Sequence, residues 1–200
     1  MHWQSLLYFF SVTLSTGMLI DLLVSDWRAD WLEKVVMRFG VGLAVMSVVG
    51  IVLNLLRIPL DYRVFLGLGL TIALCALARN PRLRCFDKKS IGESWKRSWQ
   101  SRRFWHALVM LVLFLVTLKM LMGGAFSYDY FEDGDPWGYA VVVDYIGENK
   151  TFSVPYYSVQ YSEPYTQGYQ IVMGVLSQTN DSVYWTMKFF STLIYSFGVL

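Results

Sequence analysis

Five long apolar runs constrain the fold of this chain more than any other feature of its sequence. They cover residues 5–24, 35–56, 60–78, 104–126 and 183–200. Each run is close to the ~20 residues that a helix needs to cross ~30 Å of hydrocarbon. The composition, 55% hydrophobic and 16% charged, also departs from that of an ordinary soluble domain. We therefore expect an all-α, polytopic membrane protein with five to six transmembrane helices.

A sixth apolar run, residues 165–177, is shorter and more polar than the other five. Its length leaves three possibilities open, because such a segment can cross the membrane, lie in the interface or re-enter. The last run reaches residue 200 without flanking anchor residues, and we expect the chain to be a fragment whose activity needs residues further downstream.

The charges are sorted by segment, and this sorting predicts the orientation in a cell membrane. Residues 79–103 carry nine Lys or Arg against two carboxylates, whereas residues 124–164 carry seven carboxylates against Lys150. By the positive-inside rule the basic loop is cytoplasmic, so the acidic loop is extracytoplasmic. We expect a three-helix section at residues 1–78, the basic loop at 79–103 and a second membrane section at 104–200. Lys188 is expected to anchor the inner end of the last helix.

The basic loop is expected to touch anionic lipid, and Trp95 and Trp99 suggest that part of it is an amphipathic helix on the inner leaflet. Nothing else in the chain supports nucleic-acid binding, so the lipid bilayer is the expected partner of this loop.

The acidic loop contains the stretch EDGDPWGYAVVVDYI, residues 132–146. Asp135 followed by Pro136 is typical of a helix start, where Asp caps the exposed amides and Pro occupies the first position. A cap alone does not explain Glu132 and Asp133, which add repulsion unless a cation is bound. Mg2+ or Mn2+ typically takes one or two protein carboxylates together with phosphate oxygens and water. Asp135 and Asp133 are therefore candidate metal ligands.

Tyrosines recur every four residues after the acidic loop, at positions 157, 161, 165 and 169. They predict either an interfacial aromatic belt or a platform for a sugar ring or lipid headgroup. Glu163 lies just before the chain returns to the apolar phase, and we expect it near the first acidic cluster as a third metal ligand.

Two stretches, EDGDPWGYAVVVDYI and EPYTQGYQIVMGVL, resemble elements of GT-C membrane glycosyltransferases such as the catalytic subunits of oligosaccharyltransferases. The resemblance covers roughly residues 122–200, and it implies that the section at 104–200 is the start of a GT-C-like catalytic membrane domain. It implies that a sugar moves from a polyprenyl-phosphate-linked donor to a protein, glycan or lipid acceptor on the extracytoplasmic face. It also implies that Asp135 is the catalytic or metal-binding carboxylate, with Asp133 as its helper. We expect substrate contacts from Trp137, Tyr139 and Tyr165.

Glycosyl transfer needs a polarised acceptor and a neutralised phosphate leaving group. Lys119, near the outer end of its apolar run, could meet that phosphate or could simply extend to the lipid headgroups. Two other functions stay open at this point. One is a non-enzymatic transporter or sensor whose acidic loop captures cations, and the other is a membrane scaffold whose loop is merely solvated.

Overall fold

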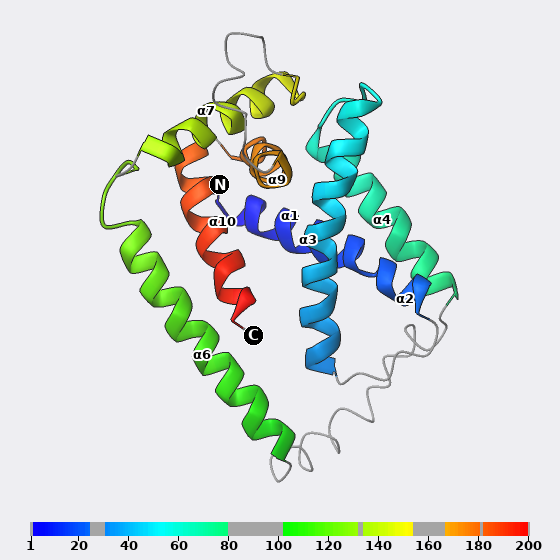
Figure 1. Ribbon diagram of the computed structural model, residues 1–200. Helices are drawn as coiled ribbons and strands as arrows, with labels where there is room; N and C mark the ends of the chain where they lie inside the picture. The colour runs from blue at the N-terminus through cyan, green and yellow to red at the C-terminus, as the bar shows by residue number, and fades with distance from the viewer. Residues whose placement is uncertain are drawn as a thin grey trace.

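The computed structural model describes residues 2–24, 31–79, 102–131, 134–153, 167–180 and 182–199. Eight helices form this part of the chain (Figure 1): α1 (His2–Gly17), α2 (Leu19–Leu23), α3 (Trp31–Leu55), α4 (Tyr62–Arg79), α6 (Arg102–Ala125), α7 (Gly134–Asn149), α9 (Gln167–Ser177) and α10 (Val183–Gly198). These described ranges contain no strand, which confirms the all-α prediction for them. Most of the basic loop, with Trp95 and Trp99, lies outside the described residues.

Four helical stretches are long and apolar enough to cross a membrane. They are Trp3–Leu23, Glu33–Leu55, Tyr62–Arg79 and Phe104–Ala125, and they match the first four apolar runs of the sequence. The fifth run forms α10, which has 16 residues, and the sixth forms α9, which has 11. At 1.5 Å per residue, α9 is only about 17 Å long, so it is too short to cross by itself.

Helix α1 packs against α3 with almost no space between their backbones. A Cβ atom added at Gly42 of α3 would lie 1.8 Å from the carbonyl oxygen of Thr13 in α1. An ion pair of 2.8 Å between Arg38 and Asp21 joins α3 to α2. The absence of a side chain at Gly42 therefore allows the close contact between α1 and α3. The ion pair holds α2, which directly follows α1, to the same helix α3.

Helix α9 lies at the centre of the described helices (Figure 1), and residues 170–177 are all buried. On one side, Ile171 lies against Gly50 of α3, and the ring of Phe65 in α4 lies close to the same glycine. On another side, Gly174 lies against Ile146 of α7. Helix α9 thus lies between α3 on one side and α7 on the other.

The turn after α9 is fixed beside the connection between α3 and α4. The side-chain amide of Gln178 donates to the Leu60 carbonyl at 2.7 Å and accepts from the Tyr62 backbone N–H at 3.0 Å. Asn180 holds the same turn to α1 by donating to Ser5 at 3.1 Å. The chain therefore turns round at this end of the molecule before α10 begins.

From that turn, α10 runs back beside α6 in the opposite direction (Figure 1). Thr192 contacts Met122 near the end of α6, and the ring of Phe197 lies 4.8 Å from that of Phe114, two turns earlier. The N-terminal half of α10 consequently lies beside the loop that follows α6. Lys188 is in this half. The prediction that Lys188 lies at the end of the last helix far from the acidic loop, as an anchor on the inner side, is therefore wrong.

Helix α7 lies across one end of the bundle (Figure 1), with Val142, Val143 and Ile146 buried on its inner face. Lys150 directly follows α7, has a positive φ of 55° and donates from its backbone N–H to the Ile146 carbonyl. This left-handed residue stops the helix and turns the chain toward Asn54 of α3.

The end of α3 and the end of α7 meet at one place. The side-chain oxygen of Asn54 accepts from the Phe152 backbone N–H at 2.8 Å, and the Leu60 N–H donates to the Lys150 carbonyl at 2.7 Å. An ion pair between Lys150 and Asp61 closes the contact. Residues 124–164 are predicted to be extracytoplasmic, and this contact places the connection between α3 and α4 at the same end of the molecule as Lys150 and Phe152.

We predict that Gly174→Ala destabilises the protein. The added Cβ would lie 2.5 Å from Cγ2 and 2.6 Å from Cβ of Ile146, so α7 and α9 would have to separate. Overpacking of this kind costs about 1–3 kcal/mol. The melting temperature of the purified protein in detergent should fall. The matched control is Gly67→Ala in α4, where a Cβ meets nothing within 4 Å and the melting temperature should stay the same or rise slightly. An equal fall in both variants would contradict the packing described for α9.

We also predict that the Asp61–Lys150 pair makes stability depend on acid pH. Hydrogen bonds from Lys150 and from the Arg63 backbone N–H lower the pKa of Asp61. The stabilisation is therefore present above the ordinary carboxyl pKa and is lost as the pH falls through the lowered value. Asp61→Asn and Lys150→Met should each reduce the fall in melting temperature below about pH 4. Glu148→Gln, at an exposed carboxylate of α7 two residues before Lys150, should leave the acid profile of the wild type unchanged.

Candidate ligand-binding cavity beside the start of α7

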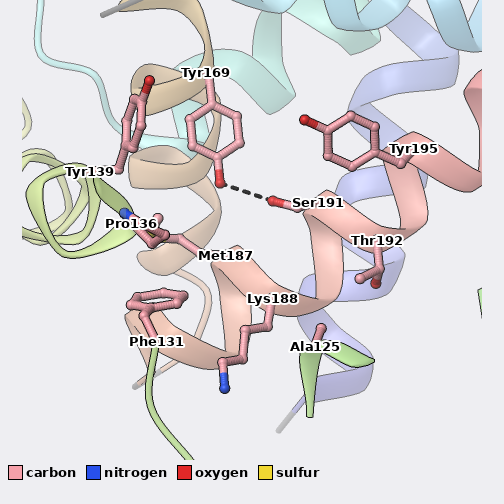
Figure 2. Close-up of a pocket in the computed structure, with 10 residues that line it drawn as sticks. All are labelled: Ala125, Phe131, Pro136, Tyr139, Tyr169, Met187, Lys188, Ser191, Thr192 and Tyr195. Carbon is pink, nitrogen blue, oxygen red and sulfur yellow. Dashed lines mark hydrogen bonds between the residues drawn. The ribbon is translucent and has the colours of Figure 1, made fainter. Parts of the chain in front are cut away.

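A cavity of about 550 Å³ lies where the end of α6, the start of α7, α9 and α10 come together (Figure 2). Its lining combines aromatic rings, hydroxyl groups and one cation. The lining residues are Ala125, Phe131, Pro136, Tyr139, Tyr169, Met187, Lys188, Ser191, Thr192 and Tyr195. A smaller cavity of about 320 Å³ continues past Lys188 toward Tyr128 and Tyr130.

Lys188 is the cation of this cavity, and its side chain is only 8% exposed. Its ammonium group donates to the carbonyls of Tyr128 and Tyr130 at 2.5 and 2.9 Å. The rings of Phe126 and Phe131 each lie 5.8 Å from the same nitrogen. A lysine ammonium has three N–H donors, so its hydrogen bonds to the described residues leave one for a ligand. No carboxylate pairs with Lys188 within the described ranges, and the cavity wall therefore carries a positive charge.

Hydroxyl groups line the opposite wall. Tyr169 of α9 and Ser191 of α10 share a hydrogen bond of 2.9 Å, and the Tyr139 ring meets the Tyr169 ring edge to face at 5.6 Å. Burial raises the pKa of Tyr169, so this residue stays a neutral hydroxyl at physiological pH. Figure 2 shows the amine of Lys188 directed away from the Tyr169–Ser191 pair, between Phe131 and Ala125. The charged and neutral polar groups thus lie at different places on the wall.

Four aromatic rings fix the loop after α6 against α7 and α10. Trp137 donates from its ring nitrogen to the Phe131 carbonyl at 3.2 Å. The Tyr184 ring lies 5.3 Å from both Phe131 and Trp137 and 5.7 Å from Tyr130. These contacts place Phe131 and the two lysine-binding carbonyls beside α10. The cavity is therefore preformed by side-chain packing.

The predicted site residues of α7 fall at different places. Tyr139 lines the cavity, whereas Trp137 faces a second cavity on another side of the helix. Helix α7 begins at Gly134, so Asp135 lies in its first turn rather than before it as a cap. A carboxylate in the first turn still interacts favourably with the helix dipole. Pro136, the next residue, lines the cavity.

The other predicted site residues are not brought to the cavity by the described structure. Lys119 is exposed on α6 and is absent from the lining of the described cavities. Asp133, Glu163 and Tyr165 lie outside the described residues, as does the side chain of Asp135. Within the described ranges, no three His, Cys, Asp or Glu side chains are grouped to hold a metal ion. The Mg2+ or Mn2+ site depends on the three carboxylates just named, and it stays a prediction.

Sequence reasoning missed the contribution of α10, namely Lys188, Ser191 and Thr192. A sequence signal for Lys188 existed, because a lysine inside an apolar helix is by default a candidate for a functional site. The position predicted for Lys188 requires residues 165–177 to cross the membrane, and α9 is too short to do so by itself. Once α9 turns back, α10 brings Lys188 to the loop after α6 instead of to the opposite end.

The fold and the cavity define an all-helical protein with four helices able to cross a membrane and an amphipathic cavity at one end of α6. Comparison with known proteins found no matching family, no similar curated protein and no similar solved structure.

Proposed function

We propose that this chain belongs to a membrane glycosyltransferase that moves a sugar from a polyprenyl-phosphate-linked donor to an acceptor. The observation that carries the proposal is the position of Lys188. A buried cation with a spare donor forms the wall of a cavity that also includes Pro136, the residue after Asp135. Charge-assisted hydrogen bonds from Lys or Arg are the usual means of holding a phosphate.

The lining suits the three chemical parts of such a donor. The phosphate would lie against Lys188, where the low exposure strengthens the attraction. The sugar would lie among the rings and hydroxyls of Tyr139, Tyr169 and Ser191. The polyprenyl chain would leave past Tyr195, whose side chain is 71% exposed on α10, toward the apolar surface of α6. A ligand of this class therefore meets its charge, its hydroxyls and its apolar tail in separate regions.

Asp135 supplies the acid–base chemistry in this proposal. A carboxylate at the start of α7 can accept the proton of an acceptor group as the bond from the acceptor to the sugar forms. The bond from the sugar to the phosphate breaks, and the polyprenyl phosphate leaves with the electron pair. Such general-base assistance contributes about 10²–10⁴-fold in rate. The role of Asp135 rests on the resemblance to GT-C enzymes, and its place in the chain beside Pro136 supports it. Among the described lining residues there is no carboxylate, so a metal ion at this cavity would need Asp133, Asp135 or Glu163. Such a metal would help to neutralise the phosphate.

The charge of the described wall favours this function over a cation-binding transporter or sensor. A cavity for a cation would be expected to place carboxylates in its wall, whereas the described wall presents the ammonium group of Lys188. An anionic group is the ligand that this charge attracts.

We predict that the full-length protein, purified and reconstituted in lipid vesicles, consumes a polyprenyl-phosphate-linked sugar in the presence of Mg2+ or Mn2+. Asp135→Asn should lower kcat at least 100-fold, because an amide cannot accept the proton. The matched control is Asp129→Asn, which changes an exposed carboxylate in the loop before α7 and should leave kcat unchanged.

Two results would count against the proposal. Absence of turnover with every polyprenyl-phosphate-linked sugar tested would reject the function. Normal turnover by Asp135→Asn would keep the function but reject Asp135 as the catalytic carboxylate. Addition of a chelator tests the metal prediction separately, and we expect it to abolish turnover.

A further inference from the structure

A second cavity, of about 330 Å³, lies between α7 and the start of α10. It is lined by Trp137, Ala140, Val141, Asp144, Ser182, Val183 and Tyr184. The first four positions follow helical spacing, so they form one face of α7. None of these residues lines the cavity that contains Lys188, so the two cavities are distinct.

The carboxylate of Asp144 is the only ionised group in this lining. Asp144 is exposed, and within the described ranges it has neither a hydrogen bond nor an ion pair. The absence of a protein cation leaves its charge available to a ligand. The nearby sequence adds to the negative field, because residues 129–148 contain six carboxylates and no Lys or Arg.

Two aromatic rings stand beside this carboxylate. Trp137 is 38% exposed, and its ring lies 5.3 Å from that of Tyr184 at an interplanar angle of 73°. The hydrogen bond from Trp137 to Phe131 fixes the indole. A ligand would therefore meet rings that are already ordered, and it would not have to pay for their immobilisation.

Aromatic faces and a carboxylate together are the usual features of a site for an organic cation. The ring quadrupole attracts a positive charge, with Trp the strongest of the aromatic residues, and the carboxylate adds direct charge attraction. The neighbouring part of the same aromatic cluster already holds a cation, since Lys188 lies over the rings of Phe126 and Phe131. A sugar would need several hydrogen-bond partners, whereas Asp144, Ser182 and Tyr184 are the only polar side chains in this lining.

We propose that the cavity between Trp137, Asp144 and Tyr184 binds an alkylammonium group. The group can belong to a lipid headgroup or to a small soluble amine, because both present the same charge to the rings and the carboxylate. This inference does not depend on the transferase activity. Since Asp144 is exposed, the affinity for the ligand is low. The binding is therefore recognised by a preference for a cation over a neutral analogue.

The test compares choline with its neutral isostere 3,3-dimethylbutanol, using saturation-transfer NMR on the full-length protein in nanodiscs of phosphatidylglycerol. Choline should bind about tenfold more tightly than the isostere. Asp144→Asn should remove this preference. The matched control is Glu148→Gln, one turn further along α7 and outside the cavity lining, which should leave it unchanged.

Equal binding of choline and the isostere to the wild type would overturn the proposal. An equal loss of the preference in Asp144→Asn and Glu148→Gln would also overturn it, because a general negative field would then be the cause. Nanodiscs of phosphatidylcholine identify the source of the group. Loss of the choline signal there supports a lipid headgroup as the ligand, and an unchanged signal supports a soluble amine.

Discussion

The burial of the short helix α9 is the constraint on which the rest of the structure depends. It is too short to cross a membrane, yet residues 170–177 are wholly buried among α3, α7 and α10. Through Ile171 it contacts Gly50 of α3, and through Gly174 it contacts Ile146 of α7, so α9 joins these two helices. Because the chain turns round after α9, α10 runs antiparallel to α6, and this direction determines which residues reach the cavity.

Two cationic side chains then hold the region around α7 in place. Lys150 connects the end of α7 to Asp61 in the α3–α4 connection, and Lys188 binds the carbonyls of the loop that precedes α7. Both lysines lie at the predicted extracytoplasmic end of the helices, where the positive-inside rule alone would not place them. The first has a carboxylate partner. The second has only carbonyls and rings among the described residues, so it remains available to an anionic ligand.

The sequence predicted those features that depend on local pattern. Four apolar runs became helices of membrane-spanning length because length and hydropathy determine them. Val142, Val143 and Ile146, which are buried on α7, have in the sequence the spacing of one face of a helix. The Asp-Pro element did lie at the start of α7, two residues further inside the helix than expected.

The features that the sequence could not predict depend on long-range packing. Composition leaves the direction of a short apolar run such as α9 undetermined, and the side on which Lys188 lies follows from that direction. Trp137 and Tyr139 were predicted to contact one substrate. They are two positions apart on α7, so their directions around the helix axis differ by about 200°. The two side chains therefore line separate cavities. The pairing of Tyr169 with Ser191 joins residues of two helices, which no periodicity indicates.

The most direct test of the central claim is the affinity of the purified protein for polyprenyl phosphate compared with the uncharged polyprenol. A charge-assisted hydrogen bond is worth about 1.5–3 kcal/mol, so the wild type should bind the phosphate roughly 10- to 100-fold more tightly than the alcohol. Lys188→Gln should lose most of this preference, and Lys119→Gln, at the exposed lysine of α6, should retain it. Equal affinity of the wild type for the two lipids, or an unchanged preference in Lys188→Gln, would contradict the account.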